Sequence, residues 1–224
     1  MKITYLGQAG FLFQTENIKI MIDPYLSNSV EKIEPHNYRR VPVDERFFEI
    51  KPDVMIFTHD HLDHYDPETA SRFIVEGAGI TVLSPRSVFD KVKKTCGGNN
   101  YVVFENGTVW TEKGIAFTAV KAVHSDPYAI GVIIDDGKKK YYITGDTLYN
   151  EYIFDCLPDD IFAVFLPING VGNNMNMCDA ARFAKKTRAK KVVPMHVGLF
   201  DEKTSEMFEC DNKVKIKIYE EIEL

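Results

Sequence analysis

Histidine and aspartate are concentrated in one short stretch of this chain, THDHLDH at residues 58–64. The 224-residue sequence contains six histidines, and three of them lie in this stretch together with two aspartates. Imidazole nitrogens and carboxylate oxygens are ligands that divalent transition metals accept in proteins. The stretch is therefore either half of a metal site or a polar turn that happens to be rich in histidine, and residues elsewhere must distinguish the two.

The spacing within the stretch favours metal binding. The apolar run at residues 54–57 predicts a buried strand. If the backbone stays extended beyond it, His59 and His61 share one face with Cα atoms about 7 Å apart, close enough to bind one ion. On a helix the same two side chains would point roughly 200° apart. Asp63 and His64 follow as the chain turns toward a helix, so they can face a second ion.

Three distant residues can complete the site, because His124, Asp146 and His196 each follow a strand-like run. Loops at one edge of a sheet converge in this way. The expected ligands are His59, His61 and His124 for one ion, Asp63, His64 and His196 for the other, and Asp146 as the bridge. Two ions held about 3.5–4 Å apart can trap a hydroxide between them. The nitrogen and oxygen ligands suit Zn²⁺, Mn²⁺ or Fe²⁺, and we expect two divalent ions, zinc or manganese.

Other polar residues support this site. Asp23 and Asp60 are candidates to orient imidazole N–H groups, with a turn or cap role as the alternative for each. The segment at residues 170–176 contains two glycines, which allow close approach of a ligand, and three asparagines, which are neutral donors. We expect the asparagines Asn173, Asn174 and Asn176 to bind substrate. The alternative is a turn rich in asparagine before a helix.

The elements that must position these residues follow from two alternating patterns. Beta-branched and aromatic runs predict strands at 2–6, 10–14, 18–22, 53–58, 80–83, 101–104, 115–123, 129–134, 140–144, 162–166, 191–195 and 213–219. Helices are expected from Pro67 to Gly77, from Arg86 to near Gly97, and after a cap at Asp179. Many strands with few helices predict two sheets packed face to face, with helices outside. The irregular stretch 24–50 is either surface decoration or a loop that covers a site.

Composition limits the function classes. The length fits one domain over residues 1–224, and a formal net charge of −6 disfavours nucleic-acid binding. No apolar run approaches the roughly 20 residues that cross a bilayer, and no signal-peptide core is present. The four cysteines are widely spaced, which indicates reduced thiols and a cytoplasmic protein. A homo-oligomer stays open.

The order of these motifs resembles that of the metallo-β-lactamase superfamily, over most of the chain. The matching elements are THDHLDH at 58–64, His124, TGDT at 144–147 and His196. The resemblance implies an α+β fold, the four-layer αββα sandwich, with metals at one edge. The stretches 5–28 and 167–200 resemble the branch that includes the bacterial L-ascorbate-6-phosphate lactonase, in which the asparagine-containing segment lies near the substrate. Relatives often carry a histidine where this chain has Gln8.

The expected function is a metal-dependent hydrolase whose metal-bridging hydroxide attacks a small anionic ester or lactone. Asp63 is the expected catalytic residue, because its carboxylate can accept the proton of the nucleophile. A phosphodiesterase or nuclease of the same superfamily is the alternative, disfavoured by the negative net charge and by the short stretch between Asp146 and His196. A metal-stabilised binding or redox-sensing module is a third interpretation.

Overall fold

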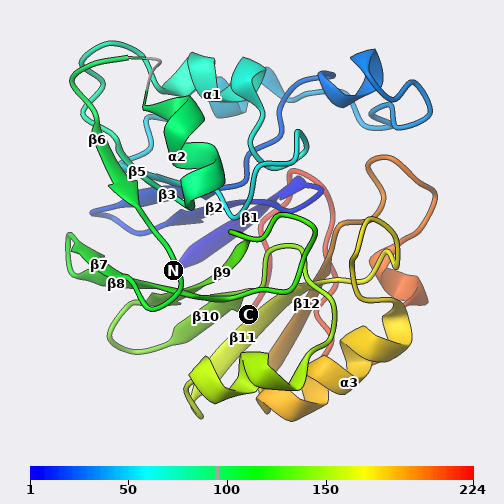
Figure 1. Ribbon diagram of the computed structural model, residues 1–224. Helices are drawn as coiled ribbons and strands as arrows, with labels where there is room; N and C mark the ends of the chain where they lie inside the picture. Colours follow the sequence, from blue (N-terminus) through cyan, green and yellow to red (C-terminus); the bar gives the residue numbers. More distant parts are fainter. Residues whose placement is uncertain (94–95) are drawn as a thin grey trace.

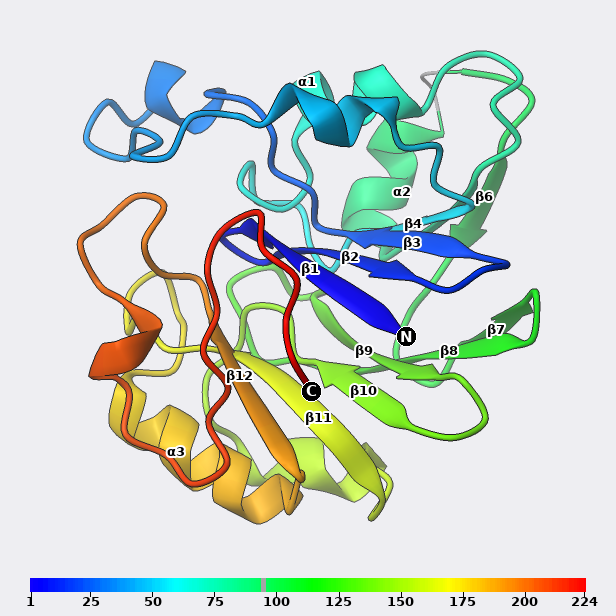
Figure 2. The same ribbon diagram turned by 180° about the vertical axis from the view of Figure 1, so that it is seen from behind.

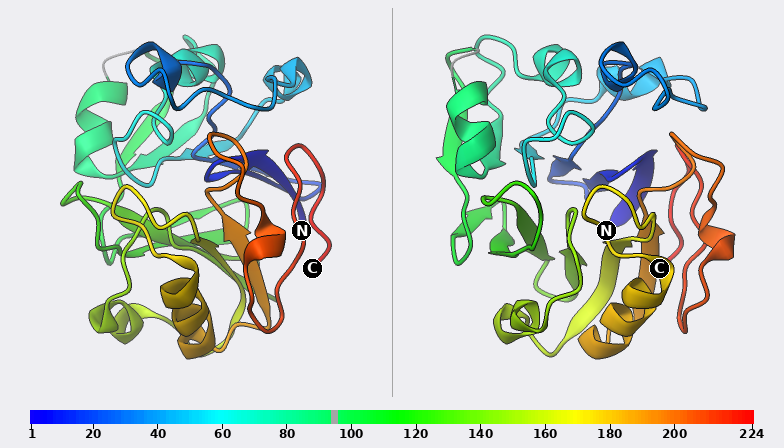
Figure 3. Two further views of the ribbon diagram at one scale, coloured as in Figure 1. Left: turned by 90° about the vertical axis from the view of Figure 1, so that its right-hand side faces the viewer. Right: turned by 45° about the vertical axis from the view of Figure 1, so that its right-hand side comes forward.

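Two six-stranded sheets pack face to face with helices on their outer faces, as the computed structural model of the chain shows (Figure 1). The structure describes residues 1–93 and 96–224. Helices α1 (Pro67–Phe73) and α2 (Arg86–Val92) cover one sheet, and α3 (Met177–Thr187) covers the other. Figure 3 shows the same order of layers from two further sides. The expected four-layer αββα sandwich is confirmed.

The first sheet has the order β1-β2-β3-β4-β5-β6. Its strands are β1 (Lys2–Gly7), β2 (Gly10–Gln14), β3 (Lys19–Ile22), β4 (Val54–Ile56), β5 (Thr81–Ser84) and β6 (Asn100–Val103). Strands β1 to β3 are antiparallel, and β3 to β6 are parallel. All residues of β4 and β5 are buried, as expected for parallel strands that have both faces covered.

The second sheet has the order β12-β11-β10-β9-β8-β7. Its strands are β7 (Val109–Glu112), β8 (Ile115–Lys121), β9 (Ile130–Asp135), β10 (Lys140–Ile143), β11 (Ile161–Pro167) and β12 (Lys191–Met195). Strand β9 is antiparallel to β8 and β10, whereas β10, β11 and β12 are parallel. Strands β8, β10 and β12 therefore run the same way, and their carboxyl ends lie at one edge of the sandwich.

Apolar contacts hold the layers together. Between the sheets, the Phe11 ring meets the Phe165 ring edge-on with centroids 5.0 Å apart, and Phe13 meets Tyr141 at 5.9 Å. Fully buried Phe183 of α3 packs in a separate cluster beneath the second sheet. A sheet that is apolar on both faces needs cover on both, which accounts for the outer helices. No helix in the described part of the chain is long and apolar enough to cross a membrane.

The stretch 24–50 contains two short 3₁₀ helices, η1 (Val30–Lys32) and η2 (Glu45–Glu49). Two more 3₁₀ helices lie outside this stretch, η3 (Glu151–Cys156) and η4 (Ser205–Met207).

The helix boundaries differ in part from those predicted. Helix α1 ends at Phe73 rather than at Gly77, and α2 ends at Val92 rather than near Gly97. The part of this second predicted helix that falls on residues 94–95 lies outside the described residues. The cap predicted at Asp179 is wrong, because α3 begins earlier and Asn176 is its N-cap.

The strand predicted at 213–219 is also wrong, and strand β7 was missed. The C-terminal segment forms only isolated bridges, one to β12 at Val192 and one to β1 at Thr4. It divides its hydrogen bonds between the two sheets, because Val214 N–H donates to Val192 and Ile222 N–H donates to Ile3. Figure 2 shows this segment between the edges of β1 and β12. Burial still alternates along this segment, but the segment does not form a hydrogen-bonded ladder with either sheet.

Candidate metal centre

All seven candidate ligands come together at one edge of the sandwich. Residues 59–64 follow β4 of the first sheet, whereas His124, Asp146 and His196 follow β8, β10 and β12 of the second. Their nitrogen and oxygen atoms form three overlapping groups with members within 4.8 Å of one another. The groups are His59, His61 and His124; His59, His64 and Asp146; and Asp63, His64 and His196.

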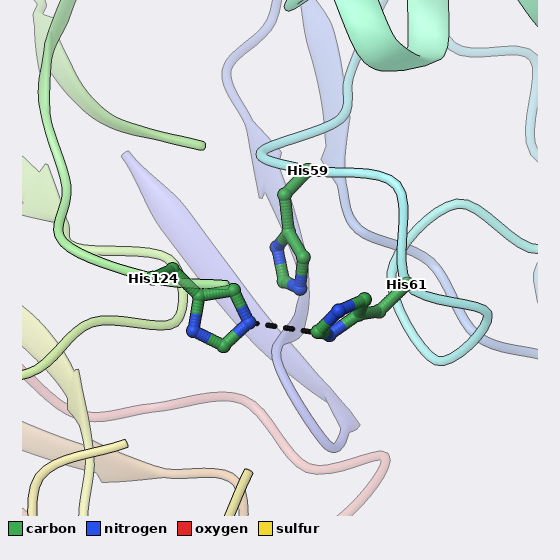
Figure 4. A group of neighbouring side chains, drawn as sticks. All are labelled: His59, His61 and His124. Atoms are coloured by element: carbon green, nitrogen blue, oxygen red, sulfur yellow. Dashed lines mark hydrogen bonds between the residues drawn. The ribbon is translucent and has the colours of Figure 1, made fainter. Parts of the chain in front are cut away.

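The first group consists of three imidazoles from two loops (Figure 4). His124 Nε2 lies 3.2 Å from His61 Nδ1, and the ring centroid of His59 lies 4.6 Å from that of each of the other two. His59 is fully buried, and its Nε2 has no hydrogen-bond partner among the described residues. Burial, assisted by nearby His64, holds the pKa of His59 well below its usual value. The ring is neutral, with a lone pair available to a metal.

The second group places two imidazoles against a carboxylate. His196 Nε2 lies 3.4 Å from His64 Nε2 and 3.2 Å from Asp63 Oδ2. Burial lowers the pKa of His196, but Asp146 and Asp63 outweigh it and raise this pKa to about 9. The pKa of Asp63 lies below its usual value, because His64 and His196 outweigh the effect of burial. In this half of the site, the positively charged His196 therefore faces the negatively charged Asp63 and Asp146.

Asp146 lies between the two groups. Its Oδ2 is 3.1 Å from His196 Nε2, and its Oδ1 is 3.3 Å from His64 Nε2. It is also within reach of His59, which belongs to the first group. Only 4% of the side chain is exposed. Asp146 is thus the carboxylate with access to both groups.

The geometry fits bound metal. Two ligand atoms that each lie about 2.1 Å from a tetrahedral ion are roughly 3.4 Å apart. The closest approaches between candidate ligands are 3.1–3.4 Å. A buried nitrogen without a partner, as at His59 Nε2, is costly unless something binds it. The site can therefore accommodate divalent ions on these residues.

Carboxylate and backbone groups hold the imidazoles from behind. Asp23 is fully buried, with Oδ2 2.8 Å from His64 Nδ1, and it accepts hydrogen bonds from the backbone N–H and hydroxyl of Thr58. The carbonyl oxygen of Asn173 lies 3.2 Å from His124 Nδ1. Partners of this kind fix the ring orientation and the tautomer of a metal ligand. Asp60, the other orienting candidate, instead pairs with Lys91 at 2.6 Å.

Sequence reasoning gave no site role to Gln8 or Asn169. The Gln8 amide nitrogen donates to Asp63 Oδ2 at 2.8 Å and lies 3.1 Å from His196 Nδ1. The Asn169 amide nitrogen lies 3.0 Å from the same Nδ1. Gln8, Asp23 and His196 all have positive φ, between 42° and 64°, and such backbone strain collects at functional sites. The unusual Gln8 in place of a histidine was the signal that could have identified it.

The three asparagines have positions that differ from one another. Asn174 is buried and joins the site, because its Nδ2 donates to Asp146 Oδ2 at 2.7 Å. Asn173 contributes its carbonyl oxygen to His124. Asn176 is exposed and accepts a hydrogen bond from Asp179 N–H as the N-cap of α3. Their predicted contacts with substrate stay a prediction, but the structure gives each of them another partner.

Gly145 lets the second sheet approach the first motif. Its φ is +60°, and a Cβ at this position would lie 2.7 Å from the carbonyl oxygen of Ile130 and 3.0 Å from Thr58 Cβ. Contacts this close exclude a larger residue without movement of the backbone. The glycine therefore places Asp146 beside residues 59–64.

A cavity of about 670 Å³ opens beside Asp63, Asp146 and His196. Part of the irregular stretch lines it, through Val30, Ile33, Glu34 and Asn37. Residues 24–50 therefore border the cavity, and their role as a loop that covers the site stays a prediction.

Comparison with known proteins agrees with this fold. Residues 2–196 match the family described as the Beta-lactamase superfamily domain. The chain is 26% identical over 216 residues to a UPF0173 metal-dependent hydrolase of Aeropyrum pernix, a match that covers 89% of this chain and 83% of that protein. It is 28% identical over 238 residues to one of Methanosarcina mazei, covering 97% and 92%. The solved structure of Igni18, described as a metallo hydrolase of Ignicoccus hospitalis, superimposes with a TM-score of 0.77 at 22% identity, covering 98% of this chain and 96% of that one.

Proposed function

The chain belongs to the Beta-lactamase superfamily domain family, and from this premise we propose that it is a metal-dependent hydrolase with a dinuclear centre. The names of its relatives, which are called metal-dependent hydrolases, support the reaction class. The observation that carries the proposal is the convergence of seven ligand side chains on overlapping positions, with Asp146 able to reach both groups. Zinc or manganese is the proposed metal, since every candidate ligand atom is nitrogen or oxygen.

The proposed roles follow from position. His59, His61 and His124 would hold one ion, Asp63, His64 and His196 the other, and Asp146 would bridge them. Bound at these positions, the ions would supply an activated water and a positive field for charge developing on the substrate. Asp23 would fix the orientation of the His64 ring, and the carbonyl of Asn173 that of the His124 ring. Asn174 would fix the carboxylate of Asp146 by a hydrogen bond.

Asp63 is the proposed proton carrier. Its side chain is 19% exposed and lines the cavity, whereas Asp146 is 4% exposed. As a carboxylate, Asp63 can accept a proton from the attacking water and pass it to the leaving oxygen. The Gln8 amide holds the Asp63 carboxylate in place. Water adds to the carbonyl carbon, the bond to the leaving oxygen breaks, and the proton ends on that oxygen.

A small ester or lactone is the proposed substrate. The resemblance to the lactonase branch supports a carbonyl centre, and a cavity of about 670 Å³ suits a small molecule. The expected negative charge on the substrate is the part that the cavity does not support, because no lysine or arginine is among its described lining residues.

The test is to purify the protein, quantify bound metal, and assay an ester, a lactone and a phosphodiester side by side. We expect close to two transition metals per chain, and His59→Ala and Asp146→Ala should lose metal and hydrolysis together. His36→Ala is the matched control, since His36 is the one histidine outside the centre and is exposed. One metal per chain that persists in Asp146→Ala would contradict the dinuclear centre, and a preference for the phosphodiester would contradict the carbonyl substrate.

A further inference from the structure

The walls of the cavity beside the metal centre combine negative charge with exposed apolar side chains. We propose, on the basis of the hydrolase function above, that the substrate is an uncharged ester or lactone with an apolar tail, and that the cavity rejects anionic tails. The proposal concerns the part of the substrate that lies away from the reacting carbonyl.

Apart from the candidate metal ligands, the charged residues of the cavity are all acidic. Asp63 and Asp146 are candidate ligands, and Asp60 is neutralised by Lys91 at 2.6 Å. Glu34 and Asp201 remain, and neither forms an ion pair with a described residue. Two carboxylates without a cationic partner raise the energy of an anionic group that lies close to them in the cavity.

The hydrogen-bond donors to Glu34 and Asp201 are uncharged groups. Glu34 accepts one hydrogen bond, from the Asn37 amide at 2.6 Å. Asp201 Oδ1 accepts from two backbone N–H groups, those of Gly198 and Lys203, each at 3.0 Å. Neither carboxylate therefore has a cationic partner among the described residues.

Two lysines that contact lining residues of the cavity are engaged there. The Lys203 ammonium donates to the carbonyl oxygen of Asn169 at 2.5 Å and is not part of the cavity lining. Lys91 is held by Asp60. A site that selected a phosphorylated or carboxylated tail would need at least one such cation directed into the cavity.

Apolar side chains from several segments line the same cavity. Ile33, in the stretch 24–50, is 68% exposed, and Val171, in the segment after β11, is 60% exposed. Leu62 and Phe200 line it as well. Large apolar side chains that stay in water beside a reactive centre gain from an apolar ligand that covers them.

The kinetic test uses two esters that differ only in the end of the acyl tail, para-nitrophenyl pentanoate and mono-para-nitrophenyl glutarate. With the metal-loaded protein we expect kcat/KM for the neutral ester to exceed that for the anionic one by at least roughly tenfold. Glu34→Lys should narrow this ratio by roughly tenfold. Glu16→Lys changes net charge equally in an exposed turn outside the cavity and should leave the ratio within about twofold.

A second pair of variants tests the apolar wall. Ile33→Ser should raise KM for the pentanoate ester roughly three- to tenfold. Val75→Ser is the control, because Val75 is also apolar and exposed (48%) but lies outside the cavity. It should leave KM for the pentanoate ester unchanged.

A binding measurement on the metal-free protein separates this proposal from the hydrolase proposal. Titration calorimetry with the uncleaved amides, pentanamide and glutaramate, should show tighter binding of the neutral one, and Glu34→Lys should reduce the difference. Equal or tighter binding of glutaramate, or faster hydrolysis of the glutarate ester, would overturn the substrate class. If the protein binds pentanamide more tightly than glutaramate but hydrolyses none of the esters, the hydrolase function is overturned and the binding preference stands.

Discussion

Asp63 and Asp146 contact the same imidazole of His196, at 3.2 and 3.1 Å, yet their surroundings suit them to different tasks. Asp146 is almost fully enclosed, and Asn174 occupies one of its oxygens. Asp63 faces the cavity and is more exposed. A carboxylate that must exchange protons with substrate has to be reachable from the cavity, so this role falls on Asp63.

The substitution Asp63→Asn tests that role, because it retains volume and an oxygen that can face a metal but removes the basic carboxylate. We expect kcat to fall by roughly 10²-fold or more with metal content largely retained. Metal analysis and steady-state kinetics on the same sample give the answer. A kcat within a few-fold of the parent would mean that Asp63 is only a ligand.

Asp23 acts through His64 rather than on the substrate. Asp23→Asn removes the charge that orients the imidazole, and we expect metal affinity to fall roughly 10- to 100-fold. Competition with a chromophoric chelator measures this. Asp66→Asn is the matched control, since Asp66 is equally buried but caps α1, and its metal affinity should stay within about twofold. Parental affinity in Asp23→Asn would remove the orienting role.

At the scale of elements, the site depends on where strands end. Strands β4, β8, β10 and β12 each end just before a candidate ligand. The polar residues that follow these strands therefore collect at one edge of the sandwich, while the apolar residues within the strands fill the core. At Gly145, where the chain leaves β10, a Cβ would lie 3.0 Å from the Cβ of Thr58, which follows β4 of the first sheet. The lack of a side chain at Gly145 allows Asp146 to reach residues from the first sheet.

Gly145→Ala should therefore destabilise the fold by at least about 2 kcal/mol and weaken metal binding, since a methyl group would meet the Ile130 carbonyl. Gly137→Ala separates crowding from backbone conformation: Gly137 also has positive φ, +80°, but open space around its Cβ position. It should cost only roughly 1 kcal/mol. Urea unfolding compares the two, and equal losses would contradict the close-approach argument.

At the scale of the whole molecule, the candidate ligands belong to both halves of the sandwich. His59, His61, Asp63 and His64 follow a strand of the first sheet, and the other three follow strands of the second. Bound metal would join the two sheets at this edge. The C-terminal segment joins them elsewhere through backbone hydrogen bonds to β1 and β12.

Metal removal should accordingly lower the stability of the whole fold. A ligand present at a thousand times its dissociation constant stabilises the folded state by about 4 kcal/mol, which for a chain of this size is roughly 10 °C in Tm. Calorimetry with and without a chelator measures the shift, and His59→Ala should show a smaller one. An unchanged Tm on chelation would mean that the metal does not link the sheets.

The sequence determined the ligand types and their place after strands, because metal chemistry needs particular side chains and a strand ends where its apolar pattern ends. It also predicted the layered fold, since periodicity of apolar residues is a local property. Only the tertiary structure decided that Asp23 serves His64 while Asp60 pairs with Lys91, and that Asn174 holds Asp146 while Asn176 caps a helix. The alternating residues 213–219 likewise divide between two sheets. In each case the outcome depends on partners far away in the chain, which local pattern cannot specify.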